Sequence, residues 1–255
     1  MSDVLVLCYH AVSESWPAAL SVTPDGLERQ LGLLHRRGFR GVTLTEALSD
    51  PPSERAVAVT FDDAYRSVLE LARPILDRFG MVGSVYAVTD WPGRSQPLSW
   101  AGVDQWLGGP HEGELAGMDW DELRALADDG WEVGSHTRSH PRLPELDDGA
   151  LEDELAGSRR DCERGMGRSC DTLAYPYGAV DERVVEAAGR AGYRFAVTLP
   201  RGLHAPRPLH WPRVGVYHAD SEWRFRLKVS PAIRSLRGSP AWAGIDGLRR
   251  RLVRR

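Results

Sequence analysis

The stretch that decides the fold is Ala56-Val57-Ala58-Val59-Thr60-Phe61-Asp62-Asp63. Its nearly continuous apolar run is typical of a strand buried on both faces of a parallel sheet, because a strand with one wet face alternates apolar and polar residues. Two carboxylates follow where this strand should end. Neighbouring side chains there cannot point in the same direction, so we expect Asp62 and Asp63 to have different roles. Capping of the following helix is one role that either could have.

Strands and helices alternate along the rest of the chain. Apolar runs predict strands at residues 4–9, 42–44, 83–89, 131–135, 172–175, 193–198 and 214–217. Helical periodicity and end signals predict helices from Thr23-Pro24 to Gly38 and over residues 65–79, 119–129, 147–164 and 181–191. This alternation predicts an α/β fold in which outer helices cover parallel strands, arranged as an open sheet or a closed barrel.

Polar residues follow several of the predicted strands. His10 comes after the first strand, the two aspartates after residues 56–61, His136 after residues 131–135, and Tyr177 shortly after residues 172–175. In parallel α/β folds the carboxyl ends of the strands face one crevice, where active sites lie. We therefore expect these side chains to gather in one place.

The segment from Ser135 to His140 carries two histidines four residues apart. If it forms a helical turn, both rings lie on one face and can bind the same ion. Two neutral imidazoles and the Asp63 carboxylate would leave one coordination position open for water, as in a catalytic metal site. We expect one divalent metal ion, with zinc as the first choice, although iron, nickel, cobalt and manganese suit the same ligands. Asp62 is then available to accept a proton from water.

Three motifs in this order resemble those of the polysaccharide deacetylase family, which includes chitooligosaccharide deacetylases. They are Thr60-Phe61-Asp62-Asp63, Ser135-His136-x-x-x-His140 and Tyr175-Pro176-Tyr177-Gly178. The resemblance spans roughly residues 4–217. It implies a distorted (β/α) barrel, usually of seven parallel strands with outer helices.

The resemblance also implies roles for individual residues. Asp62 would be the catalytic base. The backbone N–H of Tyr177 would help stabilise the oxyanion, and Pro176 would shape the acetyl pocket together with the Tyr177 side chain. The implied metal ligands are Asp63, His136 and His140.

Two features depart from the family pattern. The third motif commonly begins with an arginine that orients the base, and Ala174 stands there in this chain; the C-terminal Leu-x-His motif that usually supplies the general acid is not evident. The branch of poly-N-acetylglucosamine deacetylases carries a Tyr-His pair on its first strand, which Tyr9-His10 resembles. We therefore predict His10 as the general acid and Arg213 as the partner of Asp62. The competing candidates for the acid are His204 and His210.

Residues 90–117 form a long irregular connection, which in a compact domain is usually a functional loop. Tryptophans lie in and around it, and aromatic faces can pack against sugar rings. Packing in the core is the alternative for each of them, and for Trp131, on a predicted strand, it is the preferred one. The tryptophans are Trp91, Trp100, Trp106, Trp120 and Trp131.

Charge is unevenly distributed along the 255 residues, whose formal net charge is -4. Residues 224–255 contain ten basic residues and one acid, whereas residues 1–223 contain 22 basic and 35 acidic residues. We predict a barrel domain over residues 1–229 and a basic tail over residues 230–255. The tail could contact an anionic membrane weakly or be a solvated terminus, while the acidic body and the lack of a nucleic-acid motif argue against nucleic acid.

The beginning of the chain and its cysteines favour a cytoplasmic protein. If the basic tail binds the membrane, we expect the protein to lie at the inner membrane face. Met1-Ser2-Asp3 lacks a basic leader, and no apolar run approaches the ~18 residues of a membrane span. Three cysteines, Cys8, Cys162 and Cys170, form no Cys-x-x-Cys pair and are expected to be free thiols.

The predicted function is that of a metal-dependent hydrolase that removes an acetyl group from an N-acetylated amino sugar. The sugar could be part of a glycan, a lipid-linked precursor or a nucleotide-linked precursor. Two alternative functions are compatible with the same fold. One is an amidase acting on a non-sugar amide. The other is a carbohydrate-binding protein with weakened catalysis, suggested by Ala174.

Overall fold

The computed structural model describes residues 4–49, 55–200, 203 and 206–239. Eight parallel strands form the central sheet of this part of the chain. Their order is β10-β9-β8-β7-β6-β5-β1-β11. In this order they are Trp211–Pro212, Phe195–Thr198, Thr172–Ala174, Glu132–Ser135, Gly83–Ala87, Arg55–Phe61, Val4–Tyr9 and Val214–Gly215. A further strand, β4 (Phe39–Gly41), pairs with β5 beside this path, and β2 (Ala11–Val12) pairs separately with β3 (Ser21–Val22). The predicted α/β class and the parallel strands are confirmed.

The strands nearly close into a barrel, because β10 and β11 lie at opposite ends of the strand order yet adjoin each other in the sequence. Trp211 is in register with Val197 of β9, and Val214 is in register with Leu7 of β1. Only Arg213 separates the two strands. The expected strand number of seven differs from the observed eight because the last strand of the barrel is broken at Arg213.

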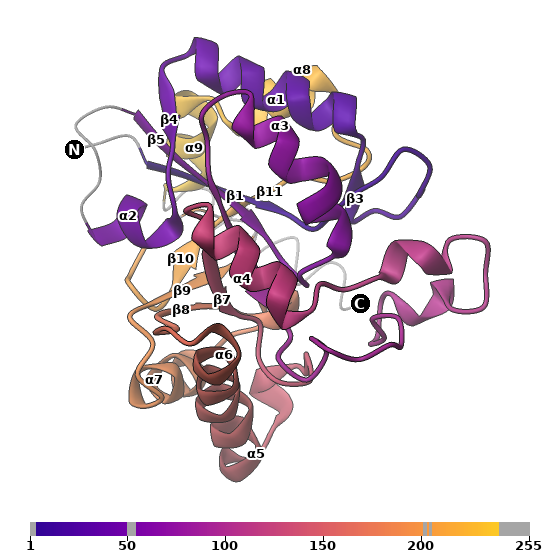
Figure 1. Cartoon of the computed structure of the whole chain (residues 1–255). Coiled ribbons are helices and arrows are strands. Elements are labelled where there is room, and N and C mark those ends of the chain that lie inside the picture. The colour runs from indigo at the N-terminus through magenta and orange to yellow at the C-terminus, as the bar shows by residue number, and fades with distance from the viewer. Residues whose placement is uncertain (1–3, 50–54, 201–202, 204–205, 240–255) are drawn as a thin grey trace, which may run out of the picture.

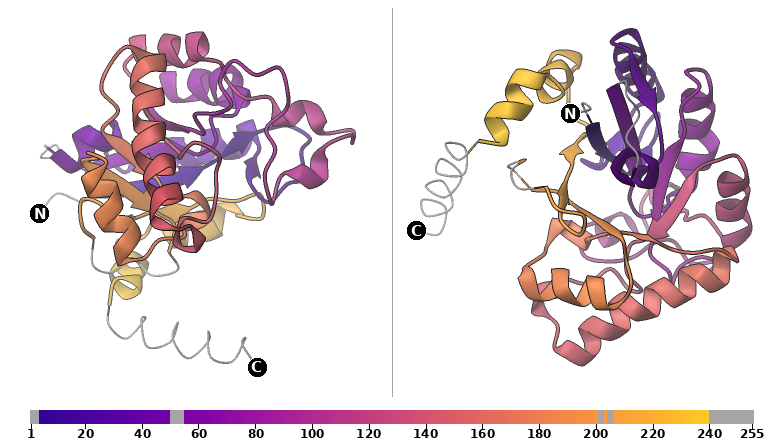
Figure 2. Two further views of the ribbon diagram at one scale, coloured as in Figure 1. Left: turned by 90° about the horizontal axis from the view of Figure 1, so that it is seen from below. Right: turned by 90° about the vertical axis from the view of Figure 1, so that its left-hand side faces the viewer.

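Helices surround the strands, as the two views of Figure 2 show. In Figure 1, α1 and α3 lie on one side of the strands and α6 and α7 on the other. The helices are α1 (Pro24–Arg36), α2 (Leu44–Ser49), α3 (Arg73–Asp77), α4 (Trp120–Asp128), α5 (Asp148–Glu152), α6 (Ser158–Met166), α7 (Glu182–Arg190), α8 (Glu222–Lys228) and α9 (Pro231–Arg237). Among the described residues, no helix combines the length and apolar character needed to cross a membrane.

Side-chain caps explain why several helices begin where the sequence predicts. Thr23 accepts a hydrogen bond from the Gly26 N–H, and Asp181 accepts one from the Val184 N–H. Asp119 and Glu122 form a reciprocal capping box at the start of α4. These bonds satisfy backbone donors that have no partner inside the helix.

One predicted strand is wrong. Residues 42–44 were expected to be extended, but the strand is β4, at Phe39–Gly41, and Leu44 begins α2. Thr43 and Glu46 form a reciprocal cap: the Glu46 carboxylate accepts from the Thr43 N–H, and the Thr43 hydroxyl accepts from the Glu46 N–H. This cap starts a helix, and it outweighs the β propensity of Val42 and Thr43.

The domain boundary at residues 229 and 230 stays a prediction. Residues 231–237 of the predicted tail form α9, and Arg234 donates a hydrogen bond of 2.7 Å to the Val4 carbonyl. The remainder of the predicted tail, residues 240–255, lies outside the described residues.

Close packing between strands requires glycine at position 134. A Cβ atom there would lie 2.7 Å from Tyr86 Cε1 and 2.8 Å from the carbonyl oxygen of Thr172 on the neighbouring strand β8. The backbone atom cannot move away without distorting the β7–β8 pairing. This glycine lies one residue before Ser135, so it also supports the segment that carries His136.

We expect Gly134→Ala to lower the free energy of unfolding by about 1–3 kcal/mol, the usual cost of overpacking a core. Denaturant-induced unfolding measures the difference. Gly113→Ala is the matched control, since nothing lies within 4 Å of a Cβ at that position. Equal stability of the two variants would contradict this account of the β7–β8 contact.

Candidate metal centre and active site

A cavity of about 390 Å³ lies where the carboxyl ends of several barrel strands meet. Its polar wall consists of residues that follow β1, β5, β7 and β10, as the strand ends predict. These polar residues are His10, Asp62, Asp63, His136, His140 and Arg213. Most of the aromatic and aliphatic wall comes from other segments and comprises Leu20, Trp100, Val103, Tyr177, Leu199 and Tyr217.

Asp63, His136 and His140 converge on one point of this cavity. The Asp63 Oδ1 atom lies 3.5 Å from the Nε2 atom of each histidine. All three side chains are buried, and one potential ligand atom from each lies within 4.8 Å of the others. The structure therefore brings together the three ligands that the resemblance implies.

The backbone that presents the two histidines is not the helical turn expected from their spacing. Thr137 and His140 have φ angles of 68° and 66°, in the left-handed region that non-glycine residues rarely adopt. The segment is thus an irregular loop, braced by a hydrogen bond of 3.2 Å from the His140 N–H to the Thr137 hydroxyl. The shared ion stays a prediction, whereas the helical turn given as its geometric reason is wrong.

Each imidazole is held in place by neighbouring groups. His136 Nδ1 lies 2.7 Å from the Ala174 carbonyl oxygen, so Nδ1 carries the proton and Nε2 presents its lone pair to Asp63. The His140 ring stacks on Trp100 at 4.6 Å and meets the Tyr177 ring edge-on at 4.5 Å. Both rings are therefore fixed before any ligand binds.

A divalent cation fits these three residues. Burial, followed by the charge of Asp62, raises the pKa of Asp63 well above its ordinary value, and Asp63 Oδ1 accepts no hydrogen bond among the described residues. Burial and the neighbouring His136 lower the pKa of His140 to about 2, so its ring is neutral at pH 7. A buried carboxylate without a donor beside two neutral imidazoles is stabilised by a positive ion.

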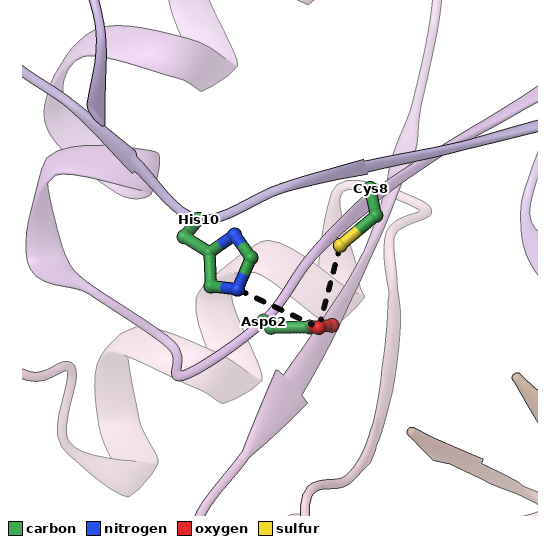
Figure 3. A group of neighbouring side chains, drawn as sticks. All are labelled: Cys8, His10 and Asp62. Atoms are coloured by element: carbon green, nitrogen blue, oxygen red, sulfur yellow. Dashed lines mark hydrogen bonds and ion pairs between the residues drawn. The ribbon is translucent and has the colours of Figure 1, made fainter. Parts of the chain in front are cut away.

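A second group of potential ligands, Cys8, His10 and Asp62, adjoins the first and is drawn in Figure 3. Cys8 Sγ donates to Asp62 Oδ2 over 3.4 Å, and His10 Nε2 lies 3.9 Å from the same oxygen. Burial raises the pKa of the Cys8 thiol well above its ordinary value, so the sulfur keeps its proton. The positive partner of this group is Arg213 rather than a metal ion.

Arg213 binds both oxygens of the Asp62 carboxylate. Nη1 donates to Oδ1 and Nη2 donates to Oδ2, each over 2.7 Å, and Nη1 also donates to the Thr60 hydroxyl over 2.9 Å. Burial alone would raise the pKa of Asp62, but the charge of Arg213 holds it well below its usual range. Asp62 is therefore ionised and fixed in orientation by a bidentate pair.

His10 completes the polar wall beside Asp62. Burial lowers the pKa of His10 to about 4, although the Asp62 carboxylate opposes part of that shift. The ring is therefore neutral at pH 7, and it must gain a proton before it can donate one.

The competing acids and the third motif lie in different surroundings. His210 precedes β10 and is not among the residues that line the cavity, whereas His204 lies outside the described residues. Tyr177 lines the cavity with a left-handed φ of 57°, and its hydroxyl donates to the Ala101 carbonyl over 3.0 Å. Pro176 is buried directly before it.

The tryptophans divide between the cavity and the core. Trp100 lines the cavity, and Trp91 packs edge-on against it at 5.9 Å. Trp106 packs edge-on against Trp16 at 5.8 Å. Trp131 is buried and stacks on Phe61, as its position on a strand led us to expect.

Sequence reasoning missed Cys8 and several residues of the cavity wall, among them Leu199 and Tyr217. Cys8 was noted only as a free thiol, yet it contacts Asp62. Cys8 lies on β1 two residues before His10, and side chains two residues apart along an extended chain point to the same side. This spacing is the signal that could have revealed the contact. Leu199 directly follows the predicted strand 193–198, and Tyr217 is the last residue of the predicted strand 214–217. Both line the cavity, but neither carries a pattern that separates it from core residues.

A parallel barrel with two histidines and a carboxylate at its strand ends, beside a second, ionised carboxylate, is an arrangement typical of metal-dependent hydrolases. Comparison with known proteins narrows this class. The sequence model described as polysaccharide deacetylase matches residues 49–196, more than half of the chain. The chain belongs to the polysaccharide deacetylase family.

Individual relatives agree with the family. The chain is 26% identical over 202 residues to YxkH of Bacillus subtilis (strain 168), whose name assigns it provisionally to the polysaccharide deacetylases; the match covers 77% of this chain and 64% of that protein. It is 22% identical over 199 residues to the poly-beta-1,6-N-acetyl-D-glucosamine N-deacetylase of Staphylococcus aureus, covering 73% and 63%. The chain thus spans somewhat less than two thirds of the length of these relatives.

A solved structure shares the fold. The deacetylase PplD of Streptococcus pyogenes, determined in complex with acetate, superposes with a TM-score of 0.73 over 89% of this chain and 98% of that one, at 21% identity. At this identity the likeness concerns the fold.

We expect Arg213→Met to lower the free energy of unfolding by about 3–5 kcal/mol at pH 7, because it leaves the buried Asp62 carboxylate without its cation. The measurement is denaturant-induced unfolding. Arg168→Met is the matched control: Arg168 pairs with Asp128 over 2.7 Å on the surface, where such a pair contributes about 0–1 kcal/mol. A loss at Arg213 no larger than that at Arg168 would show that the buried pair does not stabilise the fold.

We also expect the protein to bind one divalent ion per chain and Asp63→Ala to lose it, because this change removes the only carboxylate of the three ligands. Elemental analysis after gel filtration measures the bound ion. His10→Ala should retain it, since His10 lines the same cavity outside the ligand set. Equal metal content in the two variants would remove the assigned site.

Proposed function

We propose that this chain is a metal-dependent deacetylase that hydrolyses the acetamide of an N-acetylated amino sugar. The observation that carries the proposal is the placement of Asp62, ionised and paired with Arg213, beside the convergent Asp63, His136 and His140 in one cavity. Membership of the polysaccharide deacetylase family supports the reaction class. The name of the Staphylococcus aureus relative supports an N-acetylglucosamine-type substrate.

In this proposal Asp63, His136 and His140 hold a divalent ion, with zinc as the first choice because the ligands are two imidazoles and one carboxylate. When bound, the ion polarises the acetyl carbonyl and acidifies a water molecule. Asp62 would act as the base that removes the proton from the attacking water. The Arg213 bidentate contact keeps the Asp62 carboxylate ionised and aimed, so it is ready to act without rearrangement.

The amine that leaves the tetrahedral carbon needs a proton, and His10 is the residue that we assign to deliver it. Its Nε2 atom lies 3.9 Å from Asp62 Oδ2, the oxygen that would hold the proton taken from water. Asp62 can recharge a neutral His10 within one turnover once the two side chains approach to hydrogen-bond distance, which is shorter than this separation. The Tyr177 N–H is assigned to the oxyanion, and Pro176 with the Tyr177 ring to the acetyl pocket.

The wall of the cavity supports a sugar ring as the substrate. Trp100, Tyr177 and Tyr217 present aromatic surface next to the polar groups. Aromatic faces cover the apolar face of a pyranose while the polar groups contact its hydroxyls. An amidase acting on a non-sugar amide would use the same polar groups, so a substrate panel separates the two.

We expect the protein to release acetate from N-acetylglucosamine oligomers and to lose this activity in the presence of a chelator. Acetate measured by a coupled enzymatic assay is the readout, and simple amides such as acetamide form the comparison set. Release from simple amides but from no N-acetylated sugar would favour the amidase. Stoichiometric metal with no release from any amide would favour a carbohydrate-binding protein.

We expect Asp62→Asn to lower kcat by about 10²–10⁴-fold, the usual contribution of a general base, and His10→Ala to lower it by about 10²-fold. Metal content should stay unchanged in both variants, so the loss reports on proton transfer. His210→Ala serves as the control, because His210 does not line the cavity. Full activity of His10→Ala, or a large loss in His210→Ala, would overturn the assignment of the acid.

A further inference from the structure

The face of α8 that points away from the barrel is apolar. Trp223 is 63% exposed and Leu227 is 46% exposed, and their spacing of four residues puts them on one side of the helix. Phe225 and Val229 are buried and pack α8 against the body through its other side. Leu236 on the following helix α9 is 47% exposed. Figure 2, at right, shows this last helical pair at the margin of the molecule.

Basic residues accompany these exposed apolar side chains. Residues 220–237 contain five basic and two acidic residues, whereas residues 1–219 contain 22 basic and 33 acidic residues. Arg224 and Arg226 are exposed on α8 next to Trp223 and Leu227; Arg226 pairs with Glu222 over 2.5 Å, and Arg224 lies 3.9 Å from Asp220. The apolar face thus lies in a segment whose basic residues outnumber these two acids, on a body that is otherwise acidic.

The position of α8 is fixed by a partly buried ionic contact. Lys228 donates to the Asp220 carboxylate over 2.5 Å and to the Gly215 carbonyl over 2.9 Å. Asp220 also accepts from the Tyr217 N–H over 2.9 Å, and Tyr217 lines the cavity. The exposed face of α8 is therefore tied to the cavity wall.

We propose that the outward side chains of α8 and α9, namely Trp223, Arg224, Arg226, Leu227 and Leu236, form a docking face for an anionic lipid surface. A helix of seven residues is far too short to span a bilayer, so the contact is interfacial. Tryptophan and leucine enter the boundary between headgroups and acyl chains, and the arginines meet lipid phosphates. A neutral surface would satisfy only the apolar half of this face, and an acidic solute only the cationic half.

The test uses the full chain and vesicles, and it does not depend on catalysis. Vesicles of phosphatidylcholine alone are compared with vesicles of equimolar phosphatidylcholine and phosphatidylglycerol in a co-sedimentation assay. We expect binding to the anionic vesicles, little binding to the neutral ones, and a decrease as salt rises, because exposed charges are screened. The double variant Trp223→Ser with Leu227→Ser should bind the anionic vesicles at least about tenfold more weakly.

Leu107→Ser is the matched control, since Leu107 is also an exposed leucine, at 39%, but lies in the long connection between β6 and β7. It should bind as the unchanged protein does. Thermal unfolding of all variants checks that they are folded. Asp62→Asn should also bind normally, so a failure of the proposed deacetylase activity leaves this result unaffected.

Three outcomes would overturn the docking face. The first is equal binding of the double variant and the unchanged protein, and the second is equal binding to neutral and anionic vesicles. The third is a concentration-dependent dimer, seen by sedimentation velocity and abolished in the double variant, which would make this face an interface between two copies of the chain.

Discussion

Arg213 stands at the junction of β10 and β11 and reaches Asp62, which lies 151 residues earlier in the chain. Its backbone N–H donates to the Thr198 carbonyl over 3.0 Å, so the same residue continues the pairing with β9. The next residue, Val214, pairs with β1. The backbone of Arg213 therefore joins the two edges of the sheet at the point where the barrel closes, and its side chain pairs with Asp62 at the end of β5. Closure of the barrel and the charge of the candidate base thus meet at one residue.

This pair explains how two adjacent carboxylates come to differ. Both Asp62 and Asp63 are buried, and burial by itself raises the pKa of each. The guanidinium of Arg213 reverses that effect for Asp62 alone. Within the described part of the chain, no arginine or lysine pairs with Asp63, which faces two neutral imidazoles instead. Arg213 thus keeps Asp62 ionised, whereas the charge of Asp63 would be balanced by a bound metal ion.

The sequence predicts the strands and most of the helices because their signals are local. The apolar run before Asp62 and the cap at Thr23 act within a few residues, and both appear where expected. The error at β4 has the same local origin, since one reciprocal cap at Thr43 decides between helix and strand. By contrast, the spacing of His136 and His140 indicates a helical turn, whereas the backbone at Thr137 and His140 is left-handed. Nothing local in the sequence signals that conformation. The Cys8 contact with Asp62 likewise exists only once β1 and β5 are paired.

Arg213, which pairs with the candidate base Asp62, shows how a contact can be kept although the expected motif residue is absent. The resemblance leads one to expect an arginine at position 174, but Ala174 sits on β8 in a buried cluster with Tyr86. The Arg213 guanidinium lies over that same Tyr86 ring, 5.8 Å from its centre. The small Ala174 on β8 thus occurs together with an arginine, Arg213, that lies between β10 and β11. Because strands on several sides of a barrel point into the same interior, a charge can be supplied from more than one of them. The Ala174 carbonyl meanwhile accepts from His136, a role that any residue at this position could fill. The Asp62–Arg213 pair in the cavity therefore identifies this site better than the residue at any single motif position does.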